Sequence, residues 1–155
     1  MSLSASILSR LEHQHKSIAE ISANFSEEQL KARVNPDKWS AFEQIVHLCS
    51  YQPTFILRIE KMLNEESPSF ERYIAENDPH FYECLEFSLE RLISKIDSDR
   101  EFLLGKLKNL SNEELRRKGI HPKYGKLSLT QWSDFFLLHE AHHLWTMMLL
   151  LFSAS

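Results

Sequence analysis

The chain has 155 residues, of which 18 are basic and 22 acidic, giving a formal net charge of −4. This length predicts a single domain over residues 1–155 with room for a substantial hydrophobic core. The lack of a net basic charge argues against a nucleic acid partner. Cys49 and Cys84 form no CxxC pair, so we expect reduced thiols and a cytoplasmic protein. No signal peptide is visible, and His, Glu or Asp interrupts the longest apolar stretches, so no membrane span is expected.

Three glycines in the whole chain and many Leu, Glu and Lys residues favour an all-α fold. The apolar periodicity predicts four long helices, over residues 4–22, 40–64, 81–110 and 128–152. The second and fourth begin with capping boxes, Ser40 to Glu43 and Ser128 to Gln131. Pro53 lies inside the second helix and is expected to bend it.

Two short segments resemble each other, residues 24–30 (Asn-Phe-Ser-Glu-Glu-Gln-Leu) and 109–115 (Asn-Leu-Ser-Asn-Glu-Glu-Leu). Each predicts a short capped helical turn that precedes a loop and then a long capped helix. We therefore expect a four-helix bundle with long connections and short extra helical turns, built as two helix pairs of similar design. The order of the helices stays open, because every connection is long enough to cross over.

Three of the eight histidines lie close together in the last predicted helix: His139, His142 and His143. Neutral imidazole is a common metal ligand, and residues four apart on a helix point nearly the same way. His139 and His143 can therefore bind one divalent ion, whereas His142 is more consistent with a flanking position. Two imidazoles make an incomplete site, so a third ligand is needed.

His47 is the candidate for that third ligand. It follows Ser40 by seven residues and His139 follows Ser128 by eleven, which places both side chains on the same face relative to their helix starts. If the two helix pairs pack alike, His47 faces His139, which is how bundle cores build metal sites. The alternative is that His47 lies on an ordinary solvated face, since the residues around it are polar. The other four histidines, at positions 13, 15, 80 and 121, are most simply surface residues.

Two motifs resemble the DinB-like superfamily of metal-binding four-helix bundles. Residues 37–48, Asp-Lys-Trp-Ser-Ala-Phe-Glu-Gln-Ile-Val-His-Leu, resemble the family's Trp-Ser…His-Leu start of its second helix. Residues 121–125, His-Pro-Lys-Tyr-Gly, followed by residues 139–143, His-Glu-Ala-His-His, resemble its His-Pro-x-x-Gly loop and final His-x-x-x-His helix.

The resemblance implies a divalent metal held by His47, His139 and His143, with an open coordination position. Zinc or nickel is expected first, and iron or copper also suits imidazole ligands. One departure is Thr146, three residues after the last His, where the family often has Gln.

The resemblance also implies an enzyme acting on a small-molecule substrate, by thiol-dependent transfer with a low-molecular-weight thiol or by metal-activated hydrolysis. Glu43 and Tyr51, one turn on either side of His47, could orient ligands or move protons. The alternative is a non-catalytic metal-binding helical interaction module. The last helix is apolar on its back as well, where it carries Leu137, Leu144, Met148 and Leu151. A helix that is apolar on nearly every side is either fully buried or forms an oligomer interface, and the second alternative predicts a homodimer.

Residues 139–143 also match the HExxH motif of zinc metalloproteases, in which Glu140 would be the general base. These enzymes usually take a third ligand downstream, and only twelve residues follow His143. Thr146 and Leu149 occupy the Gly and His positions of the extended motif. We therefore expect no peptidase activity.

Overall fold

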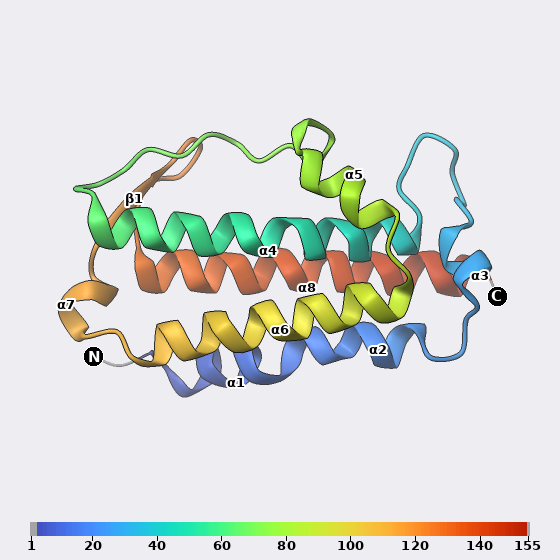
Figure 1. Ribbon diagram of the computed structural model, residues 1–155, viewed down its shortest axis with the longest axis horizontal. Helices are drawn as coiled ribbons and strands as arrows, with labels where there is room; N and C mark the ends of the chain where they lie inside the picture. Colours follow the sequence, from blue (N-terminus) through green and yellow to red (C-terminus); the bar gives the residue numbers. More distant parts are fainter. Residues whose placement is uncertain (1–2, 155) are drawn as a thin grey trace.

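The structure is a computed structural model that describes residues 3–154, and it is a bundle of long helices (Figure 1). The four predicted helices correspond to α1 (Ala5–His13) with α2 (Ser17–Ser22), α4 (Ala41–Asn64), α6 (Leu89–Lys108) and α8 (Leu129–Ala154). A short 3-10 turn, η1 (Gln14–Lys16), joins α1 to α2. The two predicted capped turns are also present, as α3 (Glu27–Lys31) and α7 (Asn112–Leu115). The prediction of a four-helix bundle is therefore confirmed.

The order of the helices around the bundle, which the sequence left open, is settled by their packing. Helix α4 packs against both α8 and α6, and α1 packs against the same two helices from the opposite side. In Figure 1, α1, α2 and α8 run in one direction and α4 and α6 in the other. Because α4 and α6 are parallel neighbours, the segment that connects them, residues 65–88, must return along the bundle. This segment carries η2 (Ala75–Asn77) and α5 (Pro79–Leu85).

The predicted helix over residues 81–110 is wrong at its beginning. Helix α5 ends at Leu85, and α6 begins only after Ser88, whose hydroxyl accepts a hydrogen bond from the backbone N–H of Arg91 at 3.2 Å. Phe87, in the intervening turn, is buried in the core. The apolar spacing that seemed continuous therefore belongs to two helices, and a serine cap separates them.

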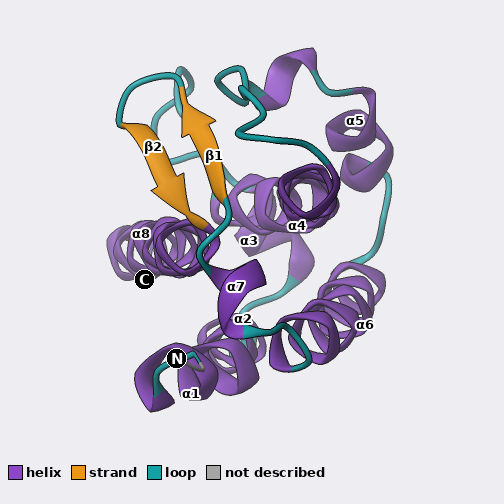
Figure 2. Ribbon diagram, turned by 90° about the vertical axis from the view of Figure 1, so that its left-hand side faces the viewer, coloured by secondary structure: helices purple, strands orange, loops and turns teal. Residues whose placement is uncertain are grey.

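A β-hairpin interrupts the expected all-α fold. Strands β1 (Lys118–His121) and β2 (Gly125–Ser128) pair antiparallel beside the start of α8 (Figure 2). Gly125 has φ +74°, a left-handed conformation that glycine adopts without strain. The indole N–H of Trp132 donates to the carbonyl of Gly119 at 3.2 Å, which fixes the hairpin on α8.

The predicted caps of α4 and α8 are confirmed. In α4, the Glu43 N–H donates to the Ser40 hydroxyl at 3.2 Å and the Ser40 N–H to the Glu43 carboxylate at 2.8 Å. The Ser128 N–H donates to the Gln131 side chain at 2.8 Å in the same arrangement. Both long helices of the candidate site therefore begin where the sequence places them.

Helix α8 is more apolar and differently oriented than expected. By length and composition alone, Leu129–Ser153 would be able to cross a membrane, with a mean hydropathy of 1.2, whereas the apolar stretches were expected to fall short. In the bundle this helix packs on α4 and α1. Of the two alternatives for the back of this helix, burial is the one found for Leu137, Leu144 and Leu151, which lie in the core. The large apolar side chains that α8 does expose include Leu138, Trp145 and Leu149.

Candidate metal centre

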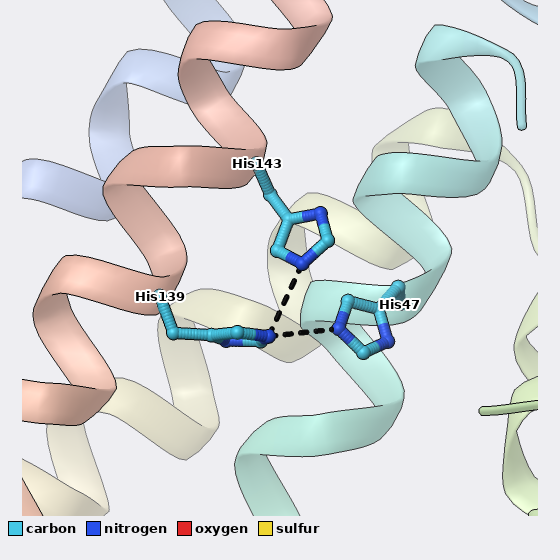
Figure 3. A group of neighbouring side chains, drawn as sticks. All are labelled: His47, His139 and His143. Atoms are coloured by element: carbon cyan, nitrogen blue, oxygen red, sulfur yellow. Dashed lines mark hydrogen bonds between the residues drawn. The ribbon is translucent and has the colours of Figure 1, made fainter. Parts of the chain in front are cut away.

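Three histidines from two antiparallel helices converge on one point (Figure 3). His47 extends from α4, and His139 and His143 extend from successive turns of α8. The Nε2 atom of His139 lies 3.1 Å from Nε2 of His47 and 3.1 Å from Nε2 of His143. All three candidate ligand atoms lie within 4.8 Å of one another. The structure thus brings together the three residues that the sequence selected.

Hydrogen bonding shows that a cation fits this arrangement. The Nδ1–H of His143 donates to the side-chain oxygen of Gln44 at 2.6 Å, which leaves its Nε2 with a lone pair and no proton. A proton on Nε2 of His139 can then form a hydrogen bond with only one of the two neighbouring Nε2 atoms, those of His47 and His143. A divalent ion satisfies all three lone pairs, and tetrahedral Zn–N bonds of about 2.0–2.1 Å would separate the nitrogens by about 3.4 Å.

Burial keeps the three imidazoles neutral, which is the form that binds metals. Burial lowers the pKa of His47 to about 3, and the neighbouring His139 adds to the effect. Burial likewise lowers the pKa of His139 to about 4 and that of His143 to about 2. At neutral pH each ring therefore offers a lone pair rather than a positive charge.

The Nδ1 atoms of the three histidines differ in their hydrogen bonding. Among the described residues, the buried Nδ1 atoms of His47 and His139 have no hydrogen-bond partner, in contrast to Nδ1 of His143. Their rings are held by aromatic packing instead. The ring of Trp39 lies 5.2 Å from that of His47, and the ring of Tyr51 lies 4.8 Å from that of His139, centroid to centroid.

The cluster opens into a pocket of about 680 Å³. All three histidines line it, together with side chains of α4 and α8, the returning segment at residues 71–76 and the hairpin turn at residues 121–124. This volume lies in the range of small-molecule sites, roughly 300–1,000 Å³. A ligand in the pocket would therefore contact the imidazole cluster directly.

The two polar residues expected beside His47 have different surroundings. Glu43 accepts from the Arg33 side chain at 3.0 Å in addition to capping α4, and it does not belong to the described lining of the pocket. Tyr51 does line the pocket, and burial raises the pKa of its hydroxyl. Of the two, only Tyr51 is placed to act on a bound molecule.

His142 and Thr146 lie outside the cluster. His142 is exposed, and its ring packs edge-on against that of His143 with the centroids 5.4 Å apart. The Thr146 hydroxyl donates to the His142 carbonyl at 2.9 Å, so it bonds within its own helix. The position where the family often has Gln therefore contributes no group to the pocket among the described lining residues.

Two histidines expected on the surface lie elsewhere. His121 lines the pocket, and its Nδ1 accepts from the backbone N–H groups of Lys123 and Tyr124 at 3.0 and 3.1 Å. Its position in the His-Pro-x-x-Gly motif was the signal that could have identified it. His15 is buried on the other side of the bundle, because η1 turns its ring toward Arg100, which donates to Nδ1 at 3.1 Å. Burial, reinforced by the Arg100 charge, lowers the pKa of His15 to about 4.

Glu140 is not a catalytic base of the HExxH type in this geometry. Its carboxylate is 2% exposed and pairs with the buried guanidinium of Arg100. It also accepts from the Gln14 side chain at 2.9 Å, and it does not belong to the described pocket lining. The HExxH match therefore combines histidines that face the pocket with a glutamate that contacts the other side of the bundle.

Comparison with known proteins gives a match over most of the chain. A family model described as the DinB superfamily matches residues 10–147. A protein of Oceanobacillus iheyensis named a putative metal-dependent hydrolase is 23% identical over 121 residues, covering 78% of this chain and 70% of the relative. YuaE of Bacillus subtilis, described as uncharacterized, is 27% identical over 135 residues, covering 77% of this chain and 81% of the relative.

Solved structures share the fold. YfiT from Bacillus subtilis, described as a probable metal-dependent hydrolase with an unusual four-helix bundle topology, superposes with a TM-score of 0.82 at 16% identity. That comparison covers 94% of this chain and 83% of YfiT. A second structure, described as a four-helix bundle protein, gives a TM-score of 0.68 at 20% identity. That comparison covers 93% of this chain and 97% of the second protein.

Proposed function

Because the chain belongs to the DinB superfamily, we propose that it is a metal-dependent hydrolase that acts on a small molecule. The ion would be held by His47, His139 and His143, with zinc or nickel as the first choice. The observation that carries the proposal is the convergence of three neutral imidazole Nε2 atoms on one point that opens into a pocket. The names of the Oceanobacillus relative and of YfiT support hydrolysis as the reaction class.

A divalent ion held in this way supplies Lewis-acid chemistry, since it lowers the pKa of a bound water or thiol. The chain's own residues set the conditions for that chemistry. Gln44 fixes the tautomer and orientation of His143 through the Nδ1–H bond. Tyr51 is neutral at neutral pH, because burial raises its pKa, so its hydroxyl can donate a hydrogen bond to a molecule in the pocket. Trp39 and Tyr73 line the pocket beside His47, with ring centroids 5.2 and 5.6 Å from that of His47.

A thiol-dependent transfer would use the same site, and the pocket volume favours keeping it as a second candidate. A space of about 680 Å³ has room for a low-molecular-weight thiol together with an acceptor. In both reactions His47, His139 and His143 would hold the ion that activates the nucleophile, and the difference lies in whether that nucleophile is water or a thiol.

The test is a substrate screen on protein reconstituted with zinc or nickel. Nitrophenyl esters and phosphate esters report hydrolysis, and small thiols with electrophilic acceptors report transfer. Activity that depends on added metal and disappears in His139→Ala supports the proposal that the protein is an enzyme. Whether the reaction requires a thiol or only water then distinguishes transfer from hydrolysis. Stoichiometric metal with no turnover of any substrate would instead support a non-catalytic metal-binding interaction module.

Three further statements belong to the same proposal. Residues 1–155 form one domain, which is supported by two core clusters that share α4 and α8. The protein works in the cytoplasm, in keeping with two free cysteines. It forms a homodimer, for which the exposed apolar side chains Leu138, Trp145 and Leu149 on α8 are the support.

A further inference from the structure

Arg58 is a buried cation in the wall of the metal pocket. It lies on α4 eleven residues after His47, which is the same helix face three turns further on. Only 9% of the residue is exposed, and it belongs to the pocket lining together with the three histidines. Helical side chains tilt toward the N-terminus of their helix, so Arg58 leans back toward the cluster.

Only neutral groups hold this guanidinium. Its Nη1 donates to the hydroxyl of Tyr51 at 3.3 Å and its Nη2 to the backbone carbonyl of Glu71 at 2.8 Å. The aromatic rings of Tyr51, Phe70 and Trp132 surround its Cζ atom, with centroids at 5.8, 5.4 and 5.6 Å. Among the described residues, no carboxylate lies within ion-pair distance of Arg58.

Arg100, which is also buried in the bundle, shows the contrast. Arg100 pairs with the carboxylate of Glu140 and also donates to the Gln52 side chain at 2.7 Å. An ion that is removed from water requires a counter-charge or a full set of hydrogen bonds. Arg100 has both, whereas Arg58 uses two of its five N–H donors and has no counter-charge among residues 3–154.

The unpaired cation and the histidine cluster face the same space. One tyrosine separates them, because Tyr51 accepts from Arg58 through its hydroxyl and packs its ring 4.8 Å from that of His139. The exposed charges at the pocket, including Arg72, Lys123 and Glu71, are solvated.

We propose that Arg58 binds an anionic group of the substrate, so that the substrate class is a small molecule carrying a carboxylate or a phosphoryl oxyanion. The inference rests on the proposed function, because the reacting bond would then lie between Arg58 and the histidine cluster. Carboxylate and phosphoryl groups share the oxygen acceptors that match the N–H fork of a guanidinium.

The experiment titrates acetate and inorganic phosphate into the full chain at low ionic strength, both stripped of metal with a chelator and reloaded with zinc. Binding is followed by the Nε–Hε signals of arginines in ¹⁵N-edited NMR spectra, with the Arg58 signal assigned from its loss in Arg58→Gln. That variant keeps an N–H donor for the Glu71 carbonyl while removing the charge. Arg58→Lys keeps the charge, and Arg72→Gln is the matched control for an exposed arginine at the same pocket.

In metal-free wild type we expect at least one probe to bind and to shift the Arg58 signal. The probe that binds with the higher affinity identifies the class of oxyanion. Arg58→Gln should weaken that affinity about 10- to 100-fold, Arg58→Lys should restore part of it, and Arg72→Gln should change it less than threefold. These outcomes hold whether or not the histidines bind zinc, so a failure of the metal site leaves them intact. No binding of either probe to folded wild type, or equal affinity in wild type and Arg58→Gln, would overturn the proposal. So would binding that requires zinc and ignores Arg58→Gln, since the anion would then sit on the metal alone.

Discussion

Glu140→Gln separates a structural role of this residue from a catalytic one. The substitution keeps the size of the side chain and an acceptor oxygen, but it leaves the buried Arg100 without its counter-charge. Breaking a buried ion pair from one side costs about 3–5 kcal/mol. The Gln52 side chain still accepts from Arg100 at 2.7 Å, so we expect the lower end, about 3 kcal/mol. For a chain of this size that loss lowers the Tm by about 6–12 °C.

The assay is urea unfolding of metal-free protein, together with elemental analysis of zinc-loaded protein. Zinc content should remain at the wild-type value, because Glu140 lies outside the cluster. Asp134→Asn is the control on the same helix: its exposed pair with Arg10, at 2.7 Å, should contribute no more than about 1 kcal/mol. An Arg100→Met/Glu140→Leu double variant should recover most of the lost stability, since neither charge remains. Unchanged stability combined with lost hydrolysis in Glu140→Gln would refute this reasoning and favour the HExxH interpretation.

Three further outcomes are expected. Zinc content should fall well below one per chain in His47→Ala, His139→Ala and His143→Ala, and full retention in the first would rule out the proposed ligand set. Burial holds the pKa values of these three histidines at about 3, 4 and 2, below about 6.5 in the unfolded chain, so the unfolded state binds more protons on acidification. Stability of the metal-free protein should therefore be complete above pH 6.5 and fall below it, by about 2 kcal/mol per histidine between pH 7 and 5; an urea midpoint that stays constant over this range would contradict it. Sedimentation at tens of micromolar should show a dimer that Trp145→Glu converts to a monomer, and a wild-type monomer would exclude the homodimer.

Local signals in the sequence were sufficient to place the long helices but not to arrange them. Ser40 and Ser128 begin helices because each side chain caps a specific backbone N–H, an interaction that spans only three residues. The break before Ser88 was missed because apolar periodicity continued across it. The parallel packing of α4 and α6 depends on the path of residues 65–88, and no short motif encodes such a path.

The same limit applies to the site. The histidines were found because helical spacing and two family motifs mark them, and these features are readable within one or two helices. Tyr73 was missed because it comes from the returning segment and reaches the cluster only through the tertiary fold, where its ring lies 5.6 Å from that of His47. The lack of a counter-charge at Arg58 could be recognised only with the neighbouring elements in place.

The hydrogen-bond partners of the buried polar atoms distinguish the functional side of α8 from its structural side. His139 and Glu140 are adjacent in the chain, and both carry buried polar groups. Both carboxylate oxygens of Glu140 have donors, from Gln14 and Arg100, so nothing further is needed to offset its desolvation. His139 has an unpartnered Nδ1 and an Nε2 that faces two other nitrogens, an arrangement that is unfavourable without a cation. A ligand that completes those bonds stabilises the fold as it binds, so zinc should raise the Tm of wild type but not of His139→Ala.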